Sequence, residues 1–369
     1  MRTVKDWWLY QGPGTSAERR ARLLGTPAPP WRAFNGEGAH PPAGAEGPAW
    51  ERTRARGADY VPDDAETDAV NTALYLRRPL LVTGKPGTGK SSLAHSIATD
   101  LGLGPVLHWP ITSRSVLREG LYQYDAIGRL QEASLEQLRV TTGAAGRRGG
   151  AGRRDRAAGR ARPRGGAAPA AARTSLSRFL RLGALGTALL PAEQPRVLLI
   201  DEIDKSDIDL PGDLLTVFED GGFAIPELSR TALDEPTVAV ATADHEAEPA
   251  TITGGQVQCR YFPVVVMTSN GERDFPPAFL RRCVRLRMEP PNEEKLARIV
   301  RKRLAVDVTE HPEYARFVKD FVERRAEGDL ATDQLLNAIQ LRLSEAWPDE
   351  ADREKFLDTV MRRLTGPTA

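Results

Sequence analysis

Short runs of apolar residues recur along the middle of the chain, separated by stretches with helical periodicity. The runs are rich in β-branched residues and lack polar alternation at their centres, which is typical of strands buried on both faces of a parallel sheet. The runs are LLVTG at 80–84, PVLHWPI at 105–111, PRVLLID at 195–201, FPVVVMTS at 262–269 and CVRLRM at 283–288. This pattern predicts an α/β fold.

Helical spacing flanks these strands on both sides. Residues 63–77 have apolar residues at three- and four-residue intervals behind an acidic start, which predicts a helix leading into the first strand. After Pro290 and Pro291 the pattern is helical only, over 292–304, 311–326, 332–346 and 350–364. We therefore expect an α/β core over residues 61–289 and a helical subdomain over residues 290–369.

The first 60 residues have a different composition. An aromatic cluster of Trp7, Trp8 and Tyr10 precedes a stretch dense in proline and glycine, TPAPPWRAFNGEGAHPPAGAEGP. Such a stretch predicts an extended arm without a core of its own. The tryptophans need a cover, either on the following domain or on a neighbouring subunit, and docking within the chain is the simpler interpretation.

Composition narrows the class of protein. The chain has 369 residues, of which 40% are hydrophobic, enough for a substantial core. It has no run of about 18 apolar residues and no apolar leader after MRTVKDWWLY, which indicates a cytoplasmic protein without a membrane span. Two cysteines and five scattered histidines show no spacing suited to a transition metal or a disulfide framework.

One segment departs from the average charge. Residues 141–173 contain nine arginines and one aspartate among glycine, alanine and proline, while the rest of the chain has 42 basic and 49 acidic residues. A segment without large apolar residues cannot offset its ordering entropy, so we expect it to be disordered. It is interpreted as a tolerated insertion, with an arm that binds nucleic acid as the alternative.

The stretch GKPGTGKS lies between the first strand and a helix and fits the phosphate-binding spacing G-x-x-x-x-G-K-S/T. Glycines let backbone N–H groups approach a phosphate, and the helix N-terminus adds its positive dipole end. Lysine then reaches the β- and γ-phosphates, and the serine hydroxyl binds Mg²⁺. The residues expected to bind the nucleotide are Gly84, Pro86, Gly87, Thr88, Gly89, Lys90, Ser91 and Ser92.

Two carboxylates end the third strand, in VLLIDEID. The carboxyl ends of parallel strands meet at one edge of the sheet, so Asp201 is expected to bind Mg²⁺ through water. Glu202 is suited to orient and deprotonate a water that attacks the γ-phosphate, a group that a switch GTPase or a kinase does not need at this position. The alternative for Glu202 is a solvated acid after a strand, and the pair favours hydrolysis.

The fourth strand ends at Asn270, whose amide could hydrogen-bond both the attacking water and the γ-phosphate; the alternative is a turn-forming asparagine before Gly271. Arg281 and Arg282 follow near the end of a short helix. They are either a surface pair at a helix C-terminus or an arginine finger that enters the active site of the next subunit.

With these elements in order, the chain resembles the AAA+ ATPases, and more narrowly the MoxR-like group. The resemblance covers about residues 60–345 apart from the arginine-rich segment, and DWWLYQGPG and PPWRAF resemble segments seen ahead of the ATPase core in one bacterial subgroup. It implies a three-layer core with a five-stranded sheet in the order 5-1-4-3-2, a helical lid, and a usually hexameric ring with ATP between subunits. It makes Asn270 the first sensor and Arg282 the better finger candidate.

The resemblance also places a hairpin at GGFAIPEL, residues 221–228, with a mobile excursion after it over 229–261. Two features depart from the family pattern. The 111 residues from Lys90 to Asp201 leave the arginine-rich segment as surplus, and EGDLATDQLLNAIQ has no basic residue where many relatives have a lid arginine, so the second sensor has no candidate.

The sequence therefore predicts an ATP- and Mg²⁺-dependent ATP hydrolase that forms a ring of identical subunits and remodels or activates a protein partner. One alternative is a nucleotide-gated assembly or signalling switch with slow hydrolysis. Another is a motor that acts on nucleic acid through residues 141–173, which the acidic remainder of the chain argues against. A P-loop kinase would explain neither Glu202 nor the arginine pair.

Overall fold

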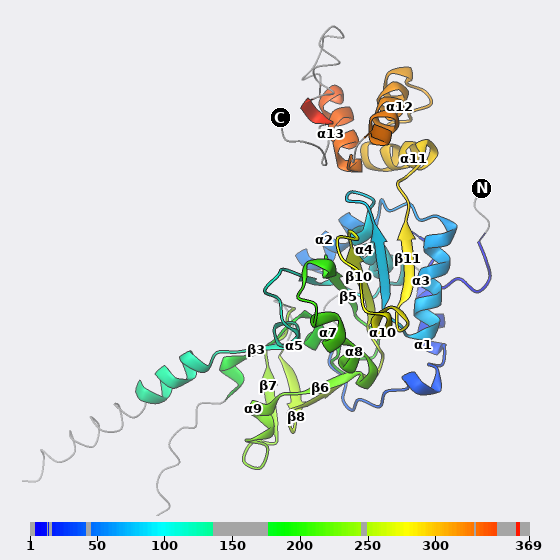
Figure 1. Ribbon diagram of the computed structural model, residues 1–369. Helices are drawn as coiled ribbons and strands as arrows, with labels where there is room; N and C mark the ends of the chain where they lie inside the picture. The colour runs from blue at the N-terminus through cyan, green and yellow to red at the C-terminus, as the bar shows by residue number, and fades with distance from the viewer. Residues whose placement is uncertain are drawn as a thin grey trace, which may run out of the picture.

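The computed structural model describes residues 4–12, 14, 17–41, 46–135, 176–244, 249–327, 330–344 and 359–361. The arginine-rich segment 141–173 lies outside them. A central sheet with helices on both faces forms the body, three helices form a unit at one end of it, and a small antiparallel sheet lies at the other end (Figure 1).

Five parallel strands make up the central sheet, which confirms the predicted parallel α/β class. Their spatial order is β11-β1-β10-β5-β2, or 5-1-4-3-2 when only these strands are counted along the chain. The neighbours pair in register, with Leu80 of β1 opposite Val266 on one side and Val284 on the other. The strands are β1 (Leu80–Gly84), β2 (Leu107–Pro110), β5 (Val197–Asp201), β10 (Val264–Ser269) and β11 (Val284–Met288).

Alternate residues of the inner strands β1, β5 and β10 enter two separate hydrophobic cores, which explains why these runs are apolar, whereas the edge strands β2 and β11 expose alternate residues. Leu80 and Val82 of β1 pack into the core formed with α1 (Ala17–Gly25), α2 (Pro48–Gly57), α3 (Asp64–Leu76) and α4 (Lys90–Leu101). Leu81 packs into the opposite core. The helices on that face are α5 (Leu117–Leu121), α7 (Ala184–Ala188), α8 (Leu210–Asp220) and α10 (Pro277–Leu280).

The N-terminal aromatic residues dock within the chain. Trp8 and Tyr10 are fully buried, and the backbone N–H groups of Leu9 and Tyr10 both donate to Asn71 Oδ1 of α3, at 2.7 and 2.9 Å. Helices α1 and α2 form where the sequence analysis predicts an extended arm, and α2 packs against α4. Proline and glycine are concentrated in the connections between these helices, including the turn η1 (Pro30–Arg32).

Four short strands between residues 222 and 258 form a second sheet where the sequence analysis places a hairpin and a mobile excursion. Its antiparallel order is β6-β9-β8-β7, with β6 (Gly222–Ala224), β7 (Thr237–Val240), β8 (Ala250–Thr253) and β9 (Gln256–Gln258). The strands are short and alternate exposed threonine, alanine or glutamine with buried valine or isoleucine, so their apolar signal is weak. The helix α9 (Pro226–Ser229) follows β6, and a separate hairpin pairs β3 (Tyr122–Tyr124) with β4 (Leu180–Leu182) after η2 (Leu176–Phe179).

The three helices beyond Pro290 have their own core, which includes Leu296, Phe321 and Leu335. They are α11 (Glu293–Leu304), α12 (Pro312–Glu327) and α13 (Thr332–Leu343). Of the fourth predicted helix, 350–364, only residues 359–361 are described, and Met361 is buried in the same core.

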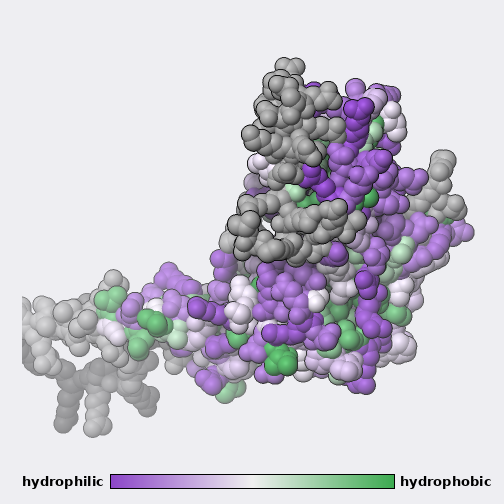
Figure 2. All heavy atoms as spheres, turned by 45° about the horizontal axis from the view of Figure 1, so that its top comes forward, coloured by the Kyte–Doolittle hydropathy of each residue, from purple (hydrophilic) through white to green (hydrophobic). Residues whose placement is uncertain are grey.

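A helix over residues 126–135 projects from the body (Figure 1). Hydrophobic side chains are exposed along the projection (Figure 2), and they include Ile127 at 72% and Leu130 at 70% exposure. Among the described residues, none of the helices combines the length and the apolar character that a bilayer crossing needs.

Candidate functional site

The glycine-rich loop joins the carboxyl end of β1 to the first turn of α4. Gly87 and Gly89 have φ angles of 73° and 93°, a region that favours glycine, and Gly89 is the N-cap of α4. A Cβ on Gly87 would lie 2.4 Å from the Cβ of Ala331, so the loop also needs glycine there because α13 begins directly above it. The predicted loop is therefore built between the sheet, α4 and the helical unit.

Lys90 is the first residue of α4, and its side chain folds back onto the loop. Its Nζ donates to Gly84 O at 2.7 Å, to Lys85 O at 2.9 Å and to Asn270 Oδ1 at 2.8 Å. The residue is 8% exposed, and burial lowers the pKa of Lys90, an effect that the negative charges of nearby acids oppose. An ammonium group in this position lies where a bound phosphate can replace the carbonyl oxygens as its partner.

Asp201 ends β5 and accepts hydrogen bonds from three neighbours. Ser91 Oγ donates to its Oδ1 at 2.7 Å, Thr268 Oγ1 donates to the same oxygen at 2.6 Å, and His108 Nε2 lies 3.3 Å from Oδ2. Burial by itself raises the pKa of Asp201, but the hydrogen bonds from His108, Thr268 and Ser91 lower it to about 2. The carboxylate is thus ionised at neutral pH and lies beside the serine of the loop.

Glu202 has a left-handed backbone, with φ 60° and ψ 48°. This conformation costs a non-glycine residue roughly 1 kcal/mol or more, and such strain is concentrated at functional sites. The backbone N–H of Glu202 donates to Thr268 Oγ1 at 2.9 Å, and its carboxylate pairs with Lys205 Nζ at 2.7 Å. Thr268 therefore fixes both carboxylate residues, and Lys205 holds the Glu202 side chain.

Asn270 follows β10 and is positioned through its backbone by Asp204. Oδ2 of Asp204 accepts from the N–H groups of Asn270 at 2.9 Å and of Glu272 at 3.2 Å. In the described part of the chain, Asp204 Oδ1 is buried without a hydrogen-bond partner. The arrangement aims the Asn270 amide at Lys90 and leaves an acceptor open beside it.

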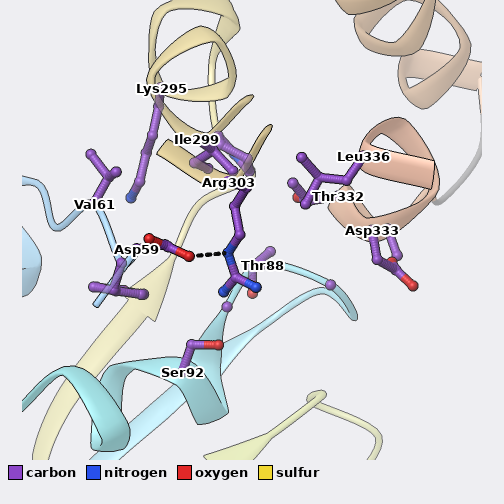
Figure 3. A pocket seen from close by; sticks show the side chains of 15 residues that line it. Asp59, Val61, Thr88, Ser92, Lys295, Ile299, Arg303, Thr332, Asp333 and Leu336 are labelled. Atoms are coloured by element: carbon purple, nitrogen blue, oxygen red, sulfur yellow. Dashed lines mark ion pairs between the residues drawn. The ribbon is translucent and has the colours of Figure 1, made fainter. Parts of the chain in front are cut away.

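A cavity of about 580 Å³ lies beside the loop, between the core and the helical unit (Figure 3). Lys295, Ile299 and Arg303 line it from one face of α11, because residues four apart along a helix share a face. Figure 3 shows Arg303 reaching toward Thr88 and Ser92 of the loop and α4, and its Nε lies 3.5 Å from Asp59 Oδ2. The remaining walls are formed by Tyr60, Val61, Gly87, Gly89, Pro291, Ala331, Thr332, Asp333 and Leu336.

A buried ion pair connects the two units at the same cavity. Lys295 Nζ lies 2.6 Å from Glu66 Oε1 and 3.2 Å from Asp63 Oδ2, which are the two capping-box residues at the start of α3. Glu66 is 3% exposed, and burial raises its pKa although Lys295 opposes the shift. The position of α11 is therefore coupled to the segment that forms the cavity wall.

The structure thus brings Lys90, Ser91, Asp201, Glu202 and Asn270 to the carboxyl edge of the sheet, with the glycine-rich loop. Arg281 and Arg282 are not part of this group. They precede β11, whose first residue pairs beside Leu80 at the start of β1, so they lie at the opposite, amino edge. Arg282 Nε pairs there with Glu219 of α8.

Several residues at the site are missing from the sequence analysis, among them Thr268, Lys205, Lys295 and Arg303. For Lys295 and Arg303 a signal exists, because they occupy one stripe of a helix with Ile299 at four-residue spacing. Thr268 and Lys205 find their partners only through tertiary packing.

No family model and no curated protein matches the chain. Among solved structures, C. elegans PCH-2 is similar with a TM-score of 0.38 and 13% sequence identity, over 84% of this chain and 72% of that chain. A likeness at this level supports no conclusion about function, so the interpretation rests on the contacts within the site.

Proposed function

We propose that the protein is a Mg²⁺-dependent ATP hydrolase of the AAA+ class, similar to the MoxR-like group, which assembles into a ring and uses hydrolysis to remodel a protein partner. The observation that supports this best is the convergence of a lysine, a serine, an aspartate and an asparagine on a glycine-rich loop at the start of a helix. Each of these side chains has a role in phosphate chemistry.

The phosphate end of the nucleotide would lie over the loop, where N–H groups at the start of α4 provide donors. Lys90 would exchange its bonds to Gly84 O and Lys85 O for bonds to phosphate oxygens. In this proposal the nucleoside occupies the cavity of about 580 Å³, between Tyr60 and Val61 of the core and Ile299 and Leu336 of the helical unit.

The side-chain oxygen atoms of Ser91 and Asp201 suit Mg²⁺, a hard cation that binds a few protein oxygens together with phosphates and water. Among the described residues, no group of three or more metal-ligating acids, histidines or cysteines is present, consistent with a cation held largely by its nucleotide. When bound, Mg²⁺ would neutralise phosphate charge. Ser91 Oγ would be a direct ligand, and the ionised Asp201 would hold a water ligand.

Glu202 is proposed to accept a proton from the attacking water, with Asn270 orienting that water. To do so, the Glu202 carboxylate must leave Lys205, with which it is paired at 2.7 Å. Both side chains of this pair are exposed by more than 40%, so separating them costs little, on the order of 1 kcal/mol or less. The pair is a resting position for the general base.

The position of Arg282 supports assembly. Leu80 and Gly84 mark the two ends of β1, about 13 Å apart at the usual rise per residue. An arginine side chain at the amino edge is therefore too short to reach a nucleotide bound at the carboxyl edge of the same sheet. It can serve as an arginine finger only for a nucleotide bound to another copy, as in a hexameric ring.

The test compares ATP hydrolysis and ATP binding in Glu202→Gln. The variant should bind Mg²⁺–ATP as tightly as the unmodified protein and lose turnover by roughly 100-fold or more. Glu51→Gln, an exposed glutamate in α2, is the matched control and should keep full activity. Full turnover by Glu202→Gln would remove Glu202 from the proposed role.

The Lys205 contact also favours a second candidate, a nucleotide-gated assembly switch in which hydrolysis is slow because the base is held away. Partner activation by a non-hydrolysable ATP analogue, at the same level as by ATP, would favour the switch. Partner-stimulated turnover far above the basal rate would favour remodelling.

A further inference from the structure

A second cavity, of about 490 Å³, lies at the amino edge of the central sheet. Its lining comes from four parts of the chain that are distant in sequence: the PPWRAF segment, the residue pair before β1, α8 and the end of α10. The residues that line this arginine pocket are Trp31, Arg32, Arg78, Glu219, Arg281 and Arg282.

The arginine pocket concentrates positive charge, with four arginines against one glutamate. Arg32 forms its buried base at 7% exposure, donates to Phe218 O and lies with its guanidinium carbon 5.3 Å from the ring centroid of Phe262. Burial lowers the pKa of Arg32, and the charges of Arg78 and Arg282 lower it further, partly offset by Glu219. Positive charges concentrated in this way favour the binding of an anion in the pocket.

The known partners leave donors for such an anion. Arg78 uses Nη1 to donate to Arg281 O at 3.2 Å, and Arg282 uses Nε to pair with Glu219. Each guanidinium has five N–H donors in a planar fork that matches phosphate oxygens. Trp31 is 70% exposed at the rim and offers a flat apolar surface beside these donors.

We infer that the arginine pocket receives the phosphates of a nucleotide bound to a second copy of this chain, with Arg78 as a cation in addition to Arg282 and with Trp31 and Arg32 of PPWRAF forming part of its wall. This inference rests on the proposed function. The second copy's nucleotide is favoured because a polyanion complements the charge, and because the pocket lies at the edge of the sheet opposite the chain's own loop.

Glu219 has a defined place in this arrangement. It neutralises Arg282 while the pocket holds no phosphate, and its negative charge opposes the binding of phosphate to that guanidinium. Arg78 lies two residues before β1, and the phosphate loop lies directly after it, so one strand supports a nucleotide site at one end and the arginine pocket at the other.

The first experiment measures anion binding without hydrolysis. Tripolyphosphate is titrated calorimetrically into the full-length Lys90→Ala variant, in which the loop has lost its lysine. Adding Arg78→Ala should weaken this binding roughly tenfold or more, Arg78→Lys should weaken it less, and Glu219→Gln should strengthen it. Adding Arg52→Ala, an exposed arginine of α2, should leave it unchanged. No binding, or binding that ignores Arg78, would overturn the inference.

The second experiment measures ATP turnover. Arg78→Ala should lower turnover at least tenfold, and mixing it with Lys90→Ala should restore part of the activity, because hybrid interfaces then pair an intact loop with an intact pocket. Turnover of Arg78→Ala equal to that of Arg52→Ala would refute the inference and leave the ATPase proposal intact. Tripolyphosphate binding that depends on Arg78, in a protein that binds ATP but never hydrolyses it, would refute the proposed hydrolysis and leave the inferred phosphate contact intact.

Discussion

Replacing Thr268 by valine should disrupt the site, because the Thr268 hydroxyl group hydrogen-bonds both Asp201 and Glu202. Thr268 is 1% exposed, donates to Asp201 Oδ1 at 2.6 Å and accepts from the backbone N–H of Glu202 at 2.9 Å. Valine has the same shape but neither function, so a carboxylate loses one of three donors and an N–H group loses its acceptor.

The expected loss of stability follows from these two contacts. A hydrogen bond to a charged group contributes about 1.5–3 kcal/mol, and an unsatisfied buried N–H costs about 1–3 kcal/mol. Because the carboxylate keeps Ser91 and His108 as partners, we expect a total near 2–4 kcal/mol at pH 7. The pKa of Asp201 should also rise from about 2 toward its ordinary value of 3.8.

The assay is urea unfolding at pH 7, followed by Mg²⁺–ATP titration and turnover on the same preparations. Thr72→Val is the matched control, since the hydroxyl of Thr72 donates to a backbone oxygen, Asp68 O, within α3. We expect Thr268→Val to lose turnover at least tenfold and the control to keep it. If both variants lose the same small free energy and both keep turnover, the hydroxyl does not organise the site.

Three further predictions concern a buried histidine of α4 and two ion pairs. Burial lowers the pKa of His95 from its ordinary 6.5 to about 4, so the contribution of His95 to stability is present above pH 6.5 and is lost as the pH falls toward 4. The free energy of unfolding of His95→Leu should therefore fall less over this pH range than that of the unmodified protein. The same pH dependence in both proteins would contradict a lowered pKa for His95. Lys295→Met leaves Glu66 buried without its cation and should cost about 3–5 kcal/mol in urea unfolding, whereas adding Glu66→Gln should recover most of it; additive losses would refute the coupling. Lys205→Ala frees Glu202 and should raise basal ATP turnover by a factor of about 2–5 with little change in stability, and a decrease would show that Lys205 assists the base.

The strands and the phosphate loop could be predicted because their signals are local. The inner strands β1, β5 and β10 are buried on both faces, so their residues are apolar almost without interruption, and Gly87 and Gly89 mark a loop whose backbone requires glycine. The carboxyl-edge position of Asp201, Glu202 and Asn270 follows from parallel strands ending at one edge.

Other features depend on partners that are distant in sequence. The strands of the second sheet are three or four residues long and bury only alternate residues, so Thr237–Val240 gives no strong pattern. The N-terminal helices were missed because the proline and glycine of their connections dominate the composition there. The pairing of Lys205 with Glu202, and of Arg303 with Asp59, depends on which side chains tertiary packing brings within reach.

Calorimetric titration of Mg²⁺–ATP into the purified protein and into its Lys90→Ala variant tests the central claim most directly. The account predicts saturable binding to the unmodified protein, with an affinity at least roughly tenfold lower in the variant because the ammonium that would contact the phosphates is removed. Absence of binding, or equal affinity in both proteins, would contradict a phosphate site at this loop.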